Sequence, residues 1–244
     1  MRNIKVVIEY DGTQYQGFQY QPGVPTIQGE LEKVLSILVK EPVTIYGAGR
    51  TDTGVHALGQ VINFRSNCTI PIEKVCVAMN SRLPIDISAA RADEMDMSFH
   101  SRYSAKRRVY RYHILNTNLR SAITCRFAWH VGRPLNDSLM SDAAQALLGV
   151  NDYLGLCRGI QETQTTVRLV DRVEVSRIGD NVTVEVSASG FLRSMMRVIV
   201  GVLVDIGLKK LPVETIEEIV RNPIKGATSA TAPPNGLCLL RVDY

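Results

Sequence analysis

The sequence predicts an α+β protein made of two pseudo-repeated β-α-β-β-α-β halves, the ferredoxin-like or RRM-like arrangement, whose mainly antiparallel sheets join around a central active-site cleft. Two observations predict this fold. Segments with the two-residue alternation of strands and segments with the helical spacing of apolar residues follow one another in the same order twice. The 244 residues are also 45% hydrophobic, which is enough for two small cores. We divide the chain into residues 1–104 and residues 105–244.

The first half opens with an alternating strand at residues 3–10. Ile4, Val6 and Ile8 alternate with polar residues up to the turn at Asp11, as in a half-buried strand. After a polar loop, Thr26 can cap a helix with apolar residues at 27, 31, 34, 35 and 38. The remaining pattern predicts strands at 42–47, 60–65 and 85–92, a helix at 72–82, and a glycine-punctuated segment at 47–59.

The second half repeats this order with additions at its start and before its final strand. A strand at 108–115 comes before the repeat. The repeat itself has a strand at 127–131, a helix at 137–148 that Gly149 closes, and strands at 166–178 and 181–188 joined by a tight turn at Gly179. A long apolar helix at 191–206, a short helix at 213–221 and a strand at 237–243 complete the prediction.

Positive charge is concentrated in the second half of the chain. Residues 1–104 hold 10 basic and 11 acidic side chains, whereas residues 105–244 hold 18 and 13. Residues 97–136 carry eight basic side chains and no acidic one: Arg102, Lys106, Arg107, Arg108, Arg111, Arg120, Arg126 and Arg133. A polyanion is a natural partner for such a stretch, because neutralised phosphates release counterions. A solvated basic face is the alternative.

Other features argue against membrane and metal functions. The first eleven residues already include charged side chains, and the longest apolar run, 198–204, stops at Asp205. The five cysteines are scattered, as expected of reduced thiols in a cytoplasmic protein, and the four histidines are isolated from them. We therefore expect no membrane segment and no metal site.

The most unusual local sequence surrounds Asp52. Three glycines, at positions 47, 49 and 54, let the backbone turn tightly around this one short acid. An Asp in such a loop is either a turn-former or a displayed carboxylate, and both interpretations stay open. Arg50 could hold the carboxylate ionised or bind a phosphate, and its alternative role is a surface charge.

Two further groups of residues can carry chemistry. Tyr103, Tyr110 and Tyr112 are interleaved with basic side chains, and aromatic faces can stack on an unpaired base while cations bind its backbone. Tyr110 is also a candidate for the core. In the long helix, Arg193 and Arg197 are expected four residues apart on one face. A buried arginine there needs an anionic partner, for which Asp52 is a candidate, and a solvent-facing Arg197 is the alternative.

These motifs together resemble the TruA family of tRNA pseudouridine synthases. The similarity runs from residues 6–12 to the C-terminus, so it covers essentially the whole chain. The most specific block is the Arg-Thr-Asp loop followed by Gly-Val-His. The blocks that carry the resemblance are residues 49–57, 99–105 and 110–112, Phe191-Leu192, Met196-Arg197, residues 199–201 and residues 232–237.

The resemblance implies an isomerase that converts uridines 38, 39 and 40 of the tRNA anticodon stem-loop to pseudouridine, as a homodimer without cofactor or metal. Asp52 would be the nucleophile, attacking either C6 of the base or C1′ of the sugar. Tyr110 would contact the target base, and Arg197 would pair with Asp52. The other expected RNA-binding residues are Arg50, His56, Arg102, Lys106 and Arg108.

The chain departs from the family pattern at several positions. Phe18 replaces a usual tryptophan and Thr53 a usual alanine, and the surroundings of Tyr153 and Arg193 also differ. Two other classes of function fit less well. A non-catalytic pair of RRM-like units would need the RNP aromatic consensus, which is absent, and a metal-dependent nuclease would need several acids near Asp52.

Overall fold

The computed structural model describes residues 1–159 and 165–244, which form an α+β protein with two compact units. One unit comprises residues 1–106 and 239–244, and the other comprises residues 107–238. The boundary after residue 106 lies two residues from the predicted one, and the last six residues group with the first unit. Among the described residues, none of the helices is both long enough and apolar enough to cross a membrane.

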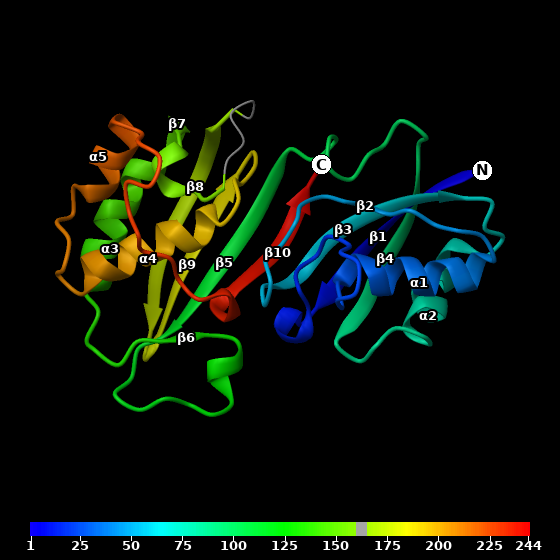
Figure 1. Cartoon of the computed structure of the whole chain (residues 1–244), viewed down its shortest axis with the longest axis horizontal. Helices are drawn as coiled ribbons and strands as arrows, with labels where there is room; N and C mark the ends of the chain where they lie inside the picture. Colours follow the sequence, from blue (N-terminus) through cyan, green and yellow to red (C-terminus); the bar gives the residue numbers. More distant parts are fainter. Residues whose placement is uncertain (160–164) are drawn as a thin grey trace. The chain divides into compact units, whose positions relative to one another are not determined.

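The first unit has the predicted element order. Strands β1 (Arg2–Tyr10), β3 (His56–Ser66) and β4 (Ile87–Met95) form an antiparallel sheet with β1 in the middle. Helices α1 (Ile27–Val39) and α2 (Ile72–Asn80) lie against this sheet (Figure 1). The short strand β2 (Tyr46–Gly47) pairs with β3. The turn η1 (Gly12–Gln14) follows β1.

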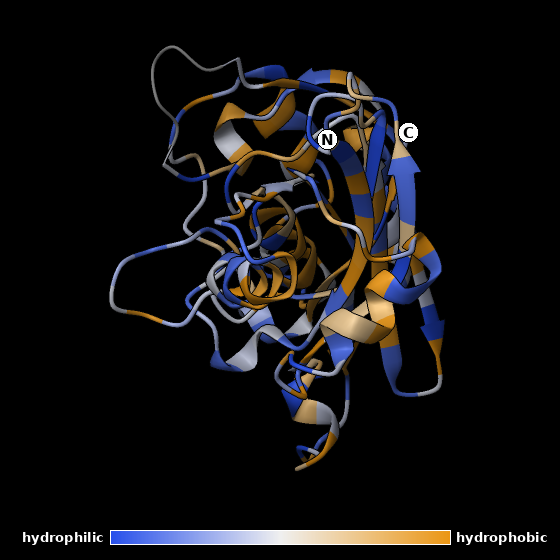
Figure 2. Cartoon of the chain, turned by 90° about the vertical axis from the view of Figure 1, so that its right-hand side faces the viewer, coloured by the Kyte–Doolittle hydropathy of each residue, from blue (hydrophilic) through white to orange (hydrophobic). Residues whose placement is uncertain are grey.

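The apolar spacing of the first unit forms its core as predicted. Ile4, Val6 and Ile8 on β1 are fully buried, and Figure 2 shows hydrophobic and hydrophilic bands alternating along the strands. Helix α1 begins where expected, because the Thr26 hydroxyl accepts a hydrogen bond from the Gly29 N–H at 3.2 Å. It ends at Lys40, whose φ of 59° is left-handed.

Three predicted strands of the first unit were wrong in extent, and the one predicted at 85–92 is β4, Ile87–Met95. Only Tyr46–Gly47 of the segment 42–47 is a strand, because the backbone before it bonds to side chains of α1. The Val43 N–H donates to Ser36 Oγ, and the Ile45 N–H donates to Glu32 Oε1, both at 3.0 Å. Strand β3 starts at His56 rather than at residue 60, so the loop around Asp52 is shorter than predicted.

The second unit is a sheet with neighbouring strands in the order β5 (Arg107–Leu115), β9 (Asn181–Ala188), β8 (Val167–Ile178) and β7 (Gly149–Asp152). All of these pairs are antiparallel. The two-residue strand β6 (Trp129–His130) pairs with β5 in parallel. Helices α3 (Asp137–Ala144) and α4 (Met195–Gly207) contact each other beside the sheet, and α5 (Thr215–Arg221) packs on α3 (Figure 1). The last strand of the chain is β10 (Leu237–Asp243).

The strand that opens the second repeat is β5, not the segment 127–131. Strand β5 of the second unit corresponds to β1 of the first, because β5 pairs with β9 just as β1 pairs with β3. The elements that follow also correspond in order: α3 to α1, β8 to β2, β9 to β3 and α4 to α2. The strand predicted at residues 127–131 was too long, because only Trp129 and His130 pair with β5, at its C-terminal end. The predicted pseudo-repeat is therefore confirmed, with β6, β7 and α5 as the additions.

Several other boundaries in the second unit differ from the prediction, and helix α5 begins at Thr215 rather than at residue 213. Helix α3 ends at Ala144, and a 3-10 turn, η3 (Gln145–Leu147), takes the place of its predicted last turn. Gly149, with a φ of 96°, does not simply close the helix but starts β7, which was not predicted. Helix α4 begins at Met195 rather than at residue 191, because Ser194 has a left-handed φ of 56°. The helix is otherwise buried on almost every side, as its uniform apolarity requires.

Candidate active site

Asp52 lies at the start of a tight turn in the first unit. The Val55 N–H donates to the Asp52 carbonyl at 3.1 Å, and Gly54 has a φ of 76°, which favours glycine. Thr51 and Val55 on either side are buried, whereas Asp52 itself is half-buried. The turn is therefore closed by a backbone hydrogen bond and by a glycine.

The loop after β1 supports this turn from one side. The Phe18 N–H donates to the Thr51 carbonyl at 3.1 Å. A Cβ atom on Gly12 would lie 2.0 Å from the Val55 carbonyl oxygen, and one on Gly17 would lie 2.8 Å from the Thr51 carbonyl oxygen. Two backbone segments can approach this closely only through glycine. The backbone around Asp52 is thus held by close packing as well as by its own turn.

A buried hydrogen-bond network supports the turn from the other side. The hydroxyl groups of Tyr10 and Thr51 are 2.9 Å apart, and Gln60 Nε2 donates to the Gly49 carbonyl at 2.9 Å. Gln60 Nε2 also lies 3.4 Å from the Tyr10 hydroxyl. Gln60 is fully buried, so these contacts satisfy polar groups that water cannot reach. They connect the segment just before the Asp52 turn to strands β1 and β3.

His56 holds the same loop at the start of β3. Its side chain is buried, and its Nδ1 lies 3.1 Å from the Gly12 nitrogen and 3.1 Å from Asp11 Oδ1. One nitrogen cannot accept and donate at once, so a neutral Nδ1 accepts the Gly12 N–H, and a protonated Nδ1 donates to Asp11. In either state the contact ties the loop after β1 to β3. This position suits loop support better than the predicted direct contact with RNA.

In the second unit, Tyr110 and Tyr112 lie on the buried face of β5, opposite Val186 and Val184 of β9. The Tyr110 ring meets the Phe191 ring edge-on, with centroids 4.8 Å apart and planes at 73°. Tyr112 is a core residue whose hydroxyl donates to the Pro233 carbonyl at 2.7 Å, and burial raises its pKa.

Arg197 lies in the first turn of α4 and is fixed to the segment before β10. Its Nε donates to the Ala232 carbonyl at 2.8 Å, and the Ala232 N–H donates back to the Arg197 carbonyl at 2.9 Å. The segment reaches the helix at Gly201, where a Cβ atom would lie 2.8 Å from the Thr231 nitrogen. Reciprocal hydrogen bonds of this kind restrict where the guanidinium can point.

Arg158 anchors the same segment, although the sequence analysis did not single it out. Its guanidinium donates to the carbonyls of Thr228 and Ala230 at 2.7 and 3.2 Å. Its backbone N–H donates to the Arg193 carbonyl at 3.0 Å, just before α4. Nothing in the local pattern marks this residue, because all of its partners except Cys157 are distant in sequence.

The positions where the chain departs from the family pattern have structural roles. Phe18 is buried, and its ring fills the space that a Cβ atom on Gly47 would need. Tyr153 is fully buried, its hydroxyl donates to the Leu147 carbonyl at 2.5 Å, and burial raises its pKa to about 12. Arg193 is exposed and precedes α4, so the expectation that it shares a helical face with Arg197 was wrong.

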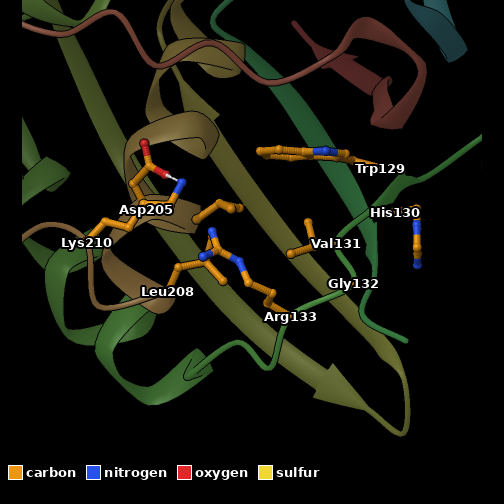
Figure 3. Close-up of a pocket in the computed structure, with 9 residues that line it drawn as sticks. Trp129, His130, Val131, Gly132, Arg133, Asp205, Leu208 and Lys210 are labelled. Atoms are coloured by element: carbon orange, nitrogen blue, oxygen red, sulfur yellow. Dashed lines mark hydrogen bonds and ion pairs between the residues drawn. The ribbon is translucent and has the colours of Figure 1, made fainter. Parts of the chain in front are cut away.

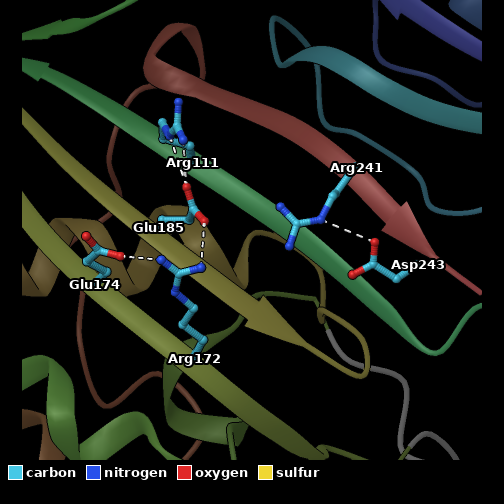
Figure 4. Close-up of polar contacts among 6 residues, drawn as sticks. All are labelled: Arg111, Arg172, Glu174, Glu185, Arg241 and Asp243. Carbon is cyan, nitrogen blue, oxygen red and sulfur yellow. Dashed lines mark hydrogen bonds and ion pairs between the residues drawn. The ribbon is translucent and has the colours of Figure 1, made fainter.

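Part of the basic stretch at 97–136 is neutralised within the second unit. Arg107 forms an ion pair with Asp171, and Arg111 donates to Glu185 through two nitrogens at 3.1 and 2.8 Å. Figure 4 shows how Arg172 of β8 bridges Glu185 and Glu174 on the same sheet. Arg108 donates to the Ser189 carbonyl at 2.9 Å. The exposed members of the stretch are Arg102, Lys106, Arg107, Arg120, Arg126 and Arg133, and of these Arg107 is the one paired with Asp171.

A pocket of about 280 Å³ lies between β6 and the end of α4. Figure 3 shows Trp129, Arg133 and Leu208 around it, with Asp205 paired to Lys210 at 2.7 Å. The residues that line it include no predicted site residue. Among residues 1–159 and 165–244, no three His, Cys, Asp or Glu side chains come together as metal ligands could.

The fold and the loop define the class of protein: an α+β protein of two compact units with one aspartate on a tight glycine turn. Comparison with known proteins makes the assignment specific. A family model described as tRNA pseudouridine synthase matches residues 6–104 and 143–244, a range that includes Asp52 and Arg197 but not Tyr110. The chain belongs to the tRNA pseudouridine synthase family, isomerases that act on tRNA, and the resemblance seen in the sequence is confirmed.

Relatives named tRNA pseudouridine synthase A match over their full length. The chain is 41% identical to the protein of Thermoanaerobacter sp. (strain X514), and each chain is covered completely. It is 42% identical to the proteins of Moorella thermoacetica and Geobacter sulfurreducens, with 99% and 100% of each chain covered. A solved structure of a Cbf5-Nop10-Gar1 complex is only 11% identical. It aligns over 97% of this chain and 48% of that chain at a TM-score of 0.38.

Proposed function

We propose that this protein converts uridines 38, 39 and 40 of the tRNA anticodon stem-loop to pseudouridine, with Asp52 as the nucleophile. The observation that carries the proposal is the construction of the Asp52 turn. Asp52 is the one acidic residue in the segment 47–59. Three contacts hold this segment: the loop after β1, the network of Tyr10, Thr51 and Gln60, and His56. A positioned nucleophile needs a rigid backbone, because small displacements of a reacting group are costly.

The reaction requires no net change in atoms or oxidation state. The N1–C1′ bond of uridine breaks, the uracil turns, C5 bonds to C1′, and the proton from C5 is lost while N1 gains one. Asp52 would add to C6 of the base or engage C1′ as the glycosidic bond breaks. Either step leaves the carboxylate unchanged at the end, so one acid suffices without a cofactor.

We assign supporting roles to two residues of the second unit. Tyr110 would contact the target base once it leaves its stack, and would assist removal of the C5 proton. Its edge-on contact with Phe191 keeps the ring in one orientation. Arg197 would be the cation that pairs with Asp52, and the hydrogen bond from its Nε to the Ala232 carbonyl restricts the guanidinium.

The RNA would be held by basic side chains, and the enzyme would act as a cytoplasmic homodimer. Arg50, Arg102 and Lys106 are exposed, which suits contact with phosphates, and Arg108 is half-buried. Sedimentation at several protein concentrations tests the dimer.

The test is release of tritium from tRNA that carries [5-³H]uridine. We expect Asp52→Asn to fold, to bind tRNA and to release no tritium above background, because the amide cannot act as the nucleophile. The matched control is Asp180→Asn, which changes an exposed aspartate in the turn between β8 and β9. Tritium release by Asp52→Asn at the rate of the control would refute the assignment of Asp52.

Two further measurements separate the finer parts of the proposal. Pseudouridine can be mapped by reverse transcription after carbodiimide treatment, and modification only outside positions 38 to 40 would contradict the proposed substrate. Arg197→Met should lower the single-turnover rate of tritium release, because the proposed ion pair with Asp52 would be lost. An unchanged single-turnover rate would separate Arg197 from Asp52.

A further inference from the structure

Three aromatic rings of the first unit stand in a row at its surface. The rings of Tyr46 and His100 have centroids 4.8 Å apart, and the rings of His100 and Tyr103 have centroids 4.5 Å apart. The guanidinium carbon of Arg102 lies 5.8 Å from the centroid of the Tyr103 ring. We call Tyr46, His100 and Tyr103 the aromatic row. Tyr46 and His100 were not identified by the sequence analysis.

The outer members of the aromatic row face solvent. Tyr103 is 77% exposed and Tyr46 is 44% exposed, while His100 between them is half-buried. A single exposed tyrosine needs no explanation. Three rings in contact, two of them open to water, form a continuous aromatic surface, and such surfaces are typical of binding sites.

The aromatic row is held in place by buried polar contacts beneath it. Ser101, which is fully buried, donates from its hydroxyl to the Tyr46 carbonyl at 2.6 Å and from its N–H to Asn63 Oδ1 at 2.9 Å. Asn63 in turn donates to Asn3 Oδ1 at 2.9 Å, and Asn3 donates to the carbonyls of Asp96 and Phe99. The turn that carries His100 and Tyr103 is therefore fixed to β1, β2 and β3. A surface that is already ordered loses little entropy when it binds a ligand.

The charge around the aromatic row is positive. Arg102 lies beside the outer ring, and Arg65 is exposed and donates to the Met97 carbonyl at 2.9 Å. Burial lowers the pKa of His100, and Arg102 and Arg65 lower it further. The imidazole is consequently neutral near pH 7, so the row offers uncharged ring faces flanked by cations. Aromatic faces next to cations suit an unpaired nucleotide, whose base stacks while its phosphate is attracted.

We infer that the aromatic row binds an unpaired nucleotide of the RNA substrate by stacking, with Tyr103 as the principal contact and Arg102 beside the adjacent phosphate. The inference rests on the proposed function for its ligand, a tRNA. The row also has a direct connection to the candidate active site along the chain. Tyr46 belongs to β2, which pairs with Asn63 and Ile62 of β3 and leads straight into the Asp52 loop. The row would therefore position the RNA and take no part in the chemistry.

The experiment measures binding of two RNAs to the full-length protein. One is an anticodon stem-loop with its unpaired loop, and the other is a fully paired duplex of the same stem. We expect Tyr103→Leu to weaken binding of the stem-loop by about 5-fold to 150-fold, the usual effect of removing one base–aromatic stack. Binding of the duplex should not change. Tyr103→Phe should restore stem-loop binding to within about twofold of the unmodified protein, because stacking requires the ring and not the hydroxyl.

Further variants separate stacking from charge and from misfolding. Tyr46→Leu should act in the same direction as Tyr103→Leu with a smaller effect, because Tyr46 is less exposed. Arg102→Gln should weaken binding of both RNAs and lower the salt slope by about 1, as loss of one phosphate contact does. Ile85→Ala is the control, since Ile85 is a fully exposed apolar residue of the same unit. Thermal denaturation of each variant verifies folding.

The possible outcomes have distinct meanings. Unchanged stem-loop binding in both Tyr103→Leu and Tyr46→Leu overturns the inference. So does an equal loss with Tyr103→Leu and Tyr103→Phe, or an equal loss on the duplex, because neither fits stacking of an unpaired base. Tritium release by the unmodified protein is measured separately. If the unmodified protein releases no tritium but the stacking effect is present, the proposed function is refuted and the inferred RNA-binding site is retained.

Discussion

Substituting Gly17 tests whether packing against the Asp52 turn controls the reaction. Gly17 has a φ of 89°, and a Cβ atom added to it would lie 2.8 Å from the Thr51 carbonyl oxygen, 3.3 Å from the Thr53 nitrogen and 3.4 Å from the Asp52 carbonyl carbon. Gly23 in the same loop has a φ of 79°, and an added Cβ atom would meet nothing within 4 Å. Gly17→Ala and Gly23→Ala therefore both place an alanine at a positive φ. Only the Gly17→Ala methyl group would contact the backbone of the Asp52 turn.

The expected magnitudes follow from this difference. Each substitution forces an alanine into a left-handed conformation, which costs about 1–2 kcal/mol of stability. At Gly17 the new methyl group also lies about 0.6 Å inside the 3.4 Å at which ordinary contact begins. Thr51 cannot retreat freely, because its carbonyl accepts the Phe18 N–H and its hydroxyl contacts Tyr10. Since a displacement of about 1 Å can cost about 100-fold in rate, we expect Gly17→Ala to lose roughly tenfold or more.

Single-turnover tritium release at saturating tRNA measures the chemical step for both variants, and urea unfolding measures their stability. Gly23→Ala should lose stability and keep the rate of the unmodified protein, whereas Gly17→Ala should lose both. Equal single-turnover rates for the two variants would refute the claim that the Gly17 contact positions Asp52. A loss of rate in Gly23→Ala as large as that in Gly17→Ala would assign the effect to the loop as a whole.

Three further predictions concern the second unit. Arg158→Ala should lower the free energy of unfolding by about 2 kcal/mol in urea titrations, because it removes charged hydrogen bonds to the Thr228 and Ala230 carbonyls, and an unchanged midpoint would contradict the anchoring role. Tyr112→Phe should lower the free energy of unfolding by about 1 kcal/mol, because the hydrogen bond to the Pro233 carbonyl is lost. A change within error of zero would show that this carbonyl accepts a hydrogen bond from another donor. Burial lowers the pKa of His113, so the unfolded chain binds more protons there and stability falls as the pH drops below about 6.5 towards the folded pKa. His113→Gln should flatten thermal stability measured between pH 7 and 5, and an unchanged slope would remove His113 from this dependence.

Local sequence patterns predicted most of the elements, because the apolar spacing that forms a strand or helix is also what the core buries. Val182, Val184 and Val186 alternate in sequence and are all fully buried. Thr26 caps α1 as its position indicates. These features depend on neighbours close in the chain, so they can be read without the fold. The same holds for the Asp52 turn, since the glycines that permit it lie beside it.

The predictions failed where the backbone depends on more than the local apolar pattern. Glu32 and Ser36 of α1 take up the N–H groups that would have extended β2, and nothing in residues 42–45 indicates this. Helix α4 starts four residues late because Ser194 adopts a left-handed conformation. Arg111 looked like part of an RNA-binding strand, yet Glu185 on β9 pairs with it. Cross-strand partners of this kind are set by register, which the local pattern does not specify.

The sequence alone determined most of the order of the elements and the family, and it indicated Asp52 as the acid for the proposed reaction, since each of these depends on contiguous residues. Tertiary structure decided what those residues contact. It assigned His56 to loop support and Tyr153 to the core, and it brought Tyr46 beside His100 from a position more than fifty residues away. The physical reason is that burial and ring contacts depend on which strands become neighbours, and that choice is made by packing of the whole unit.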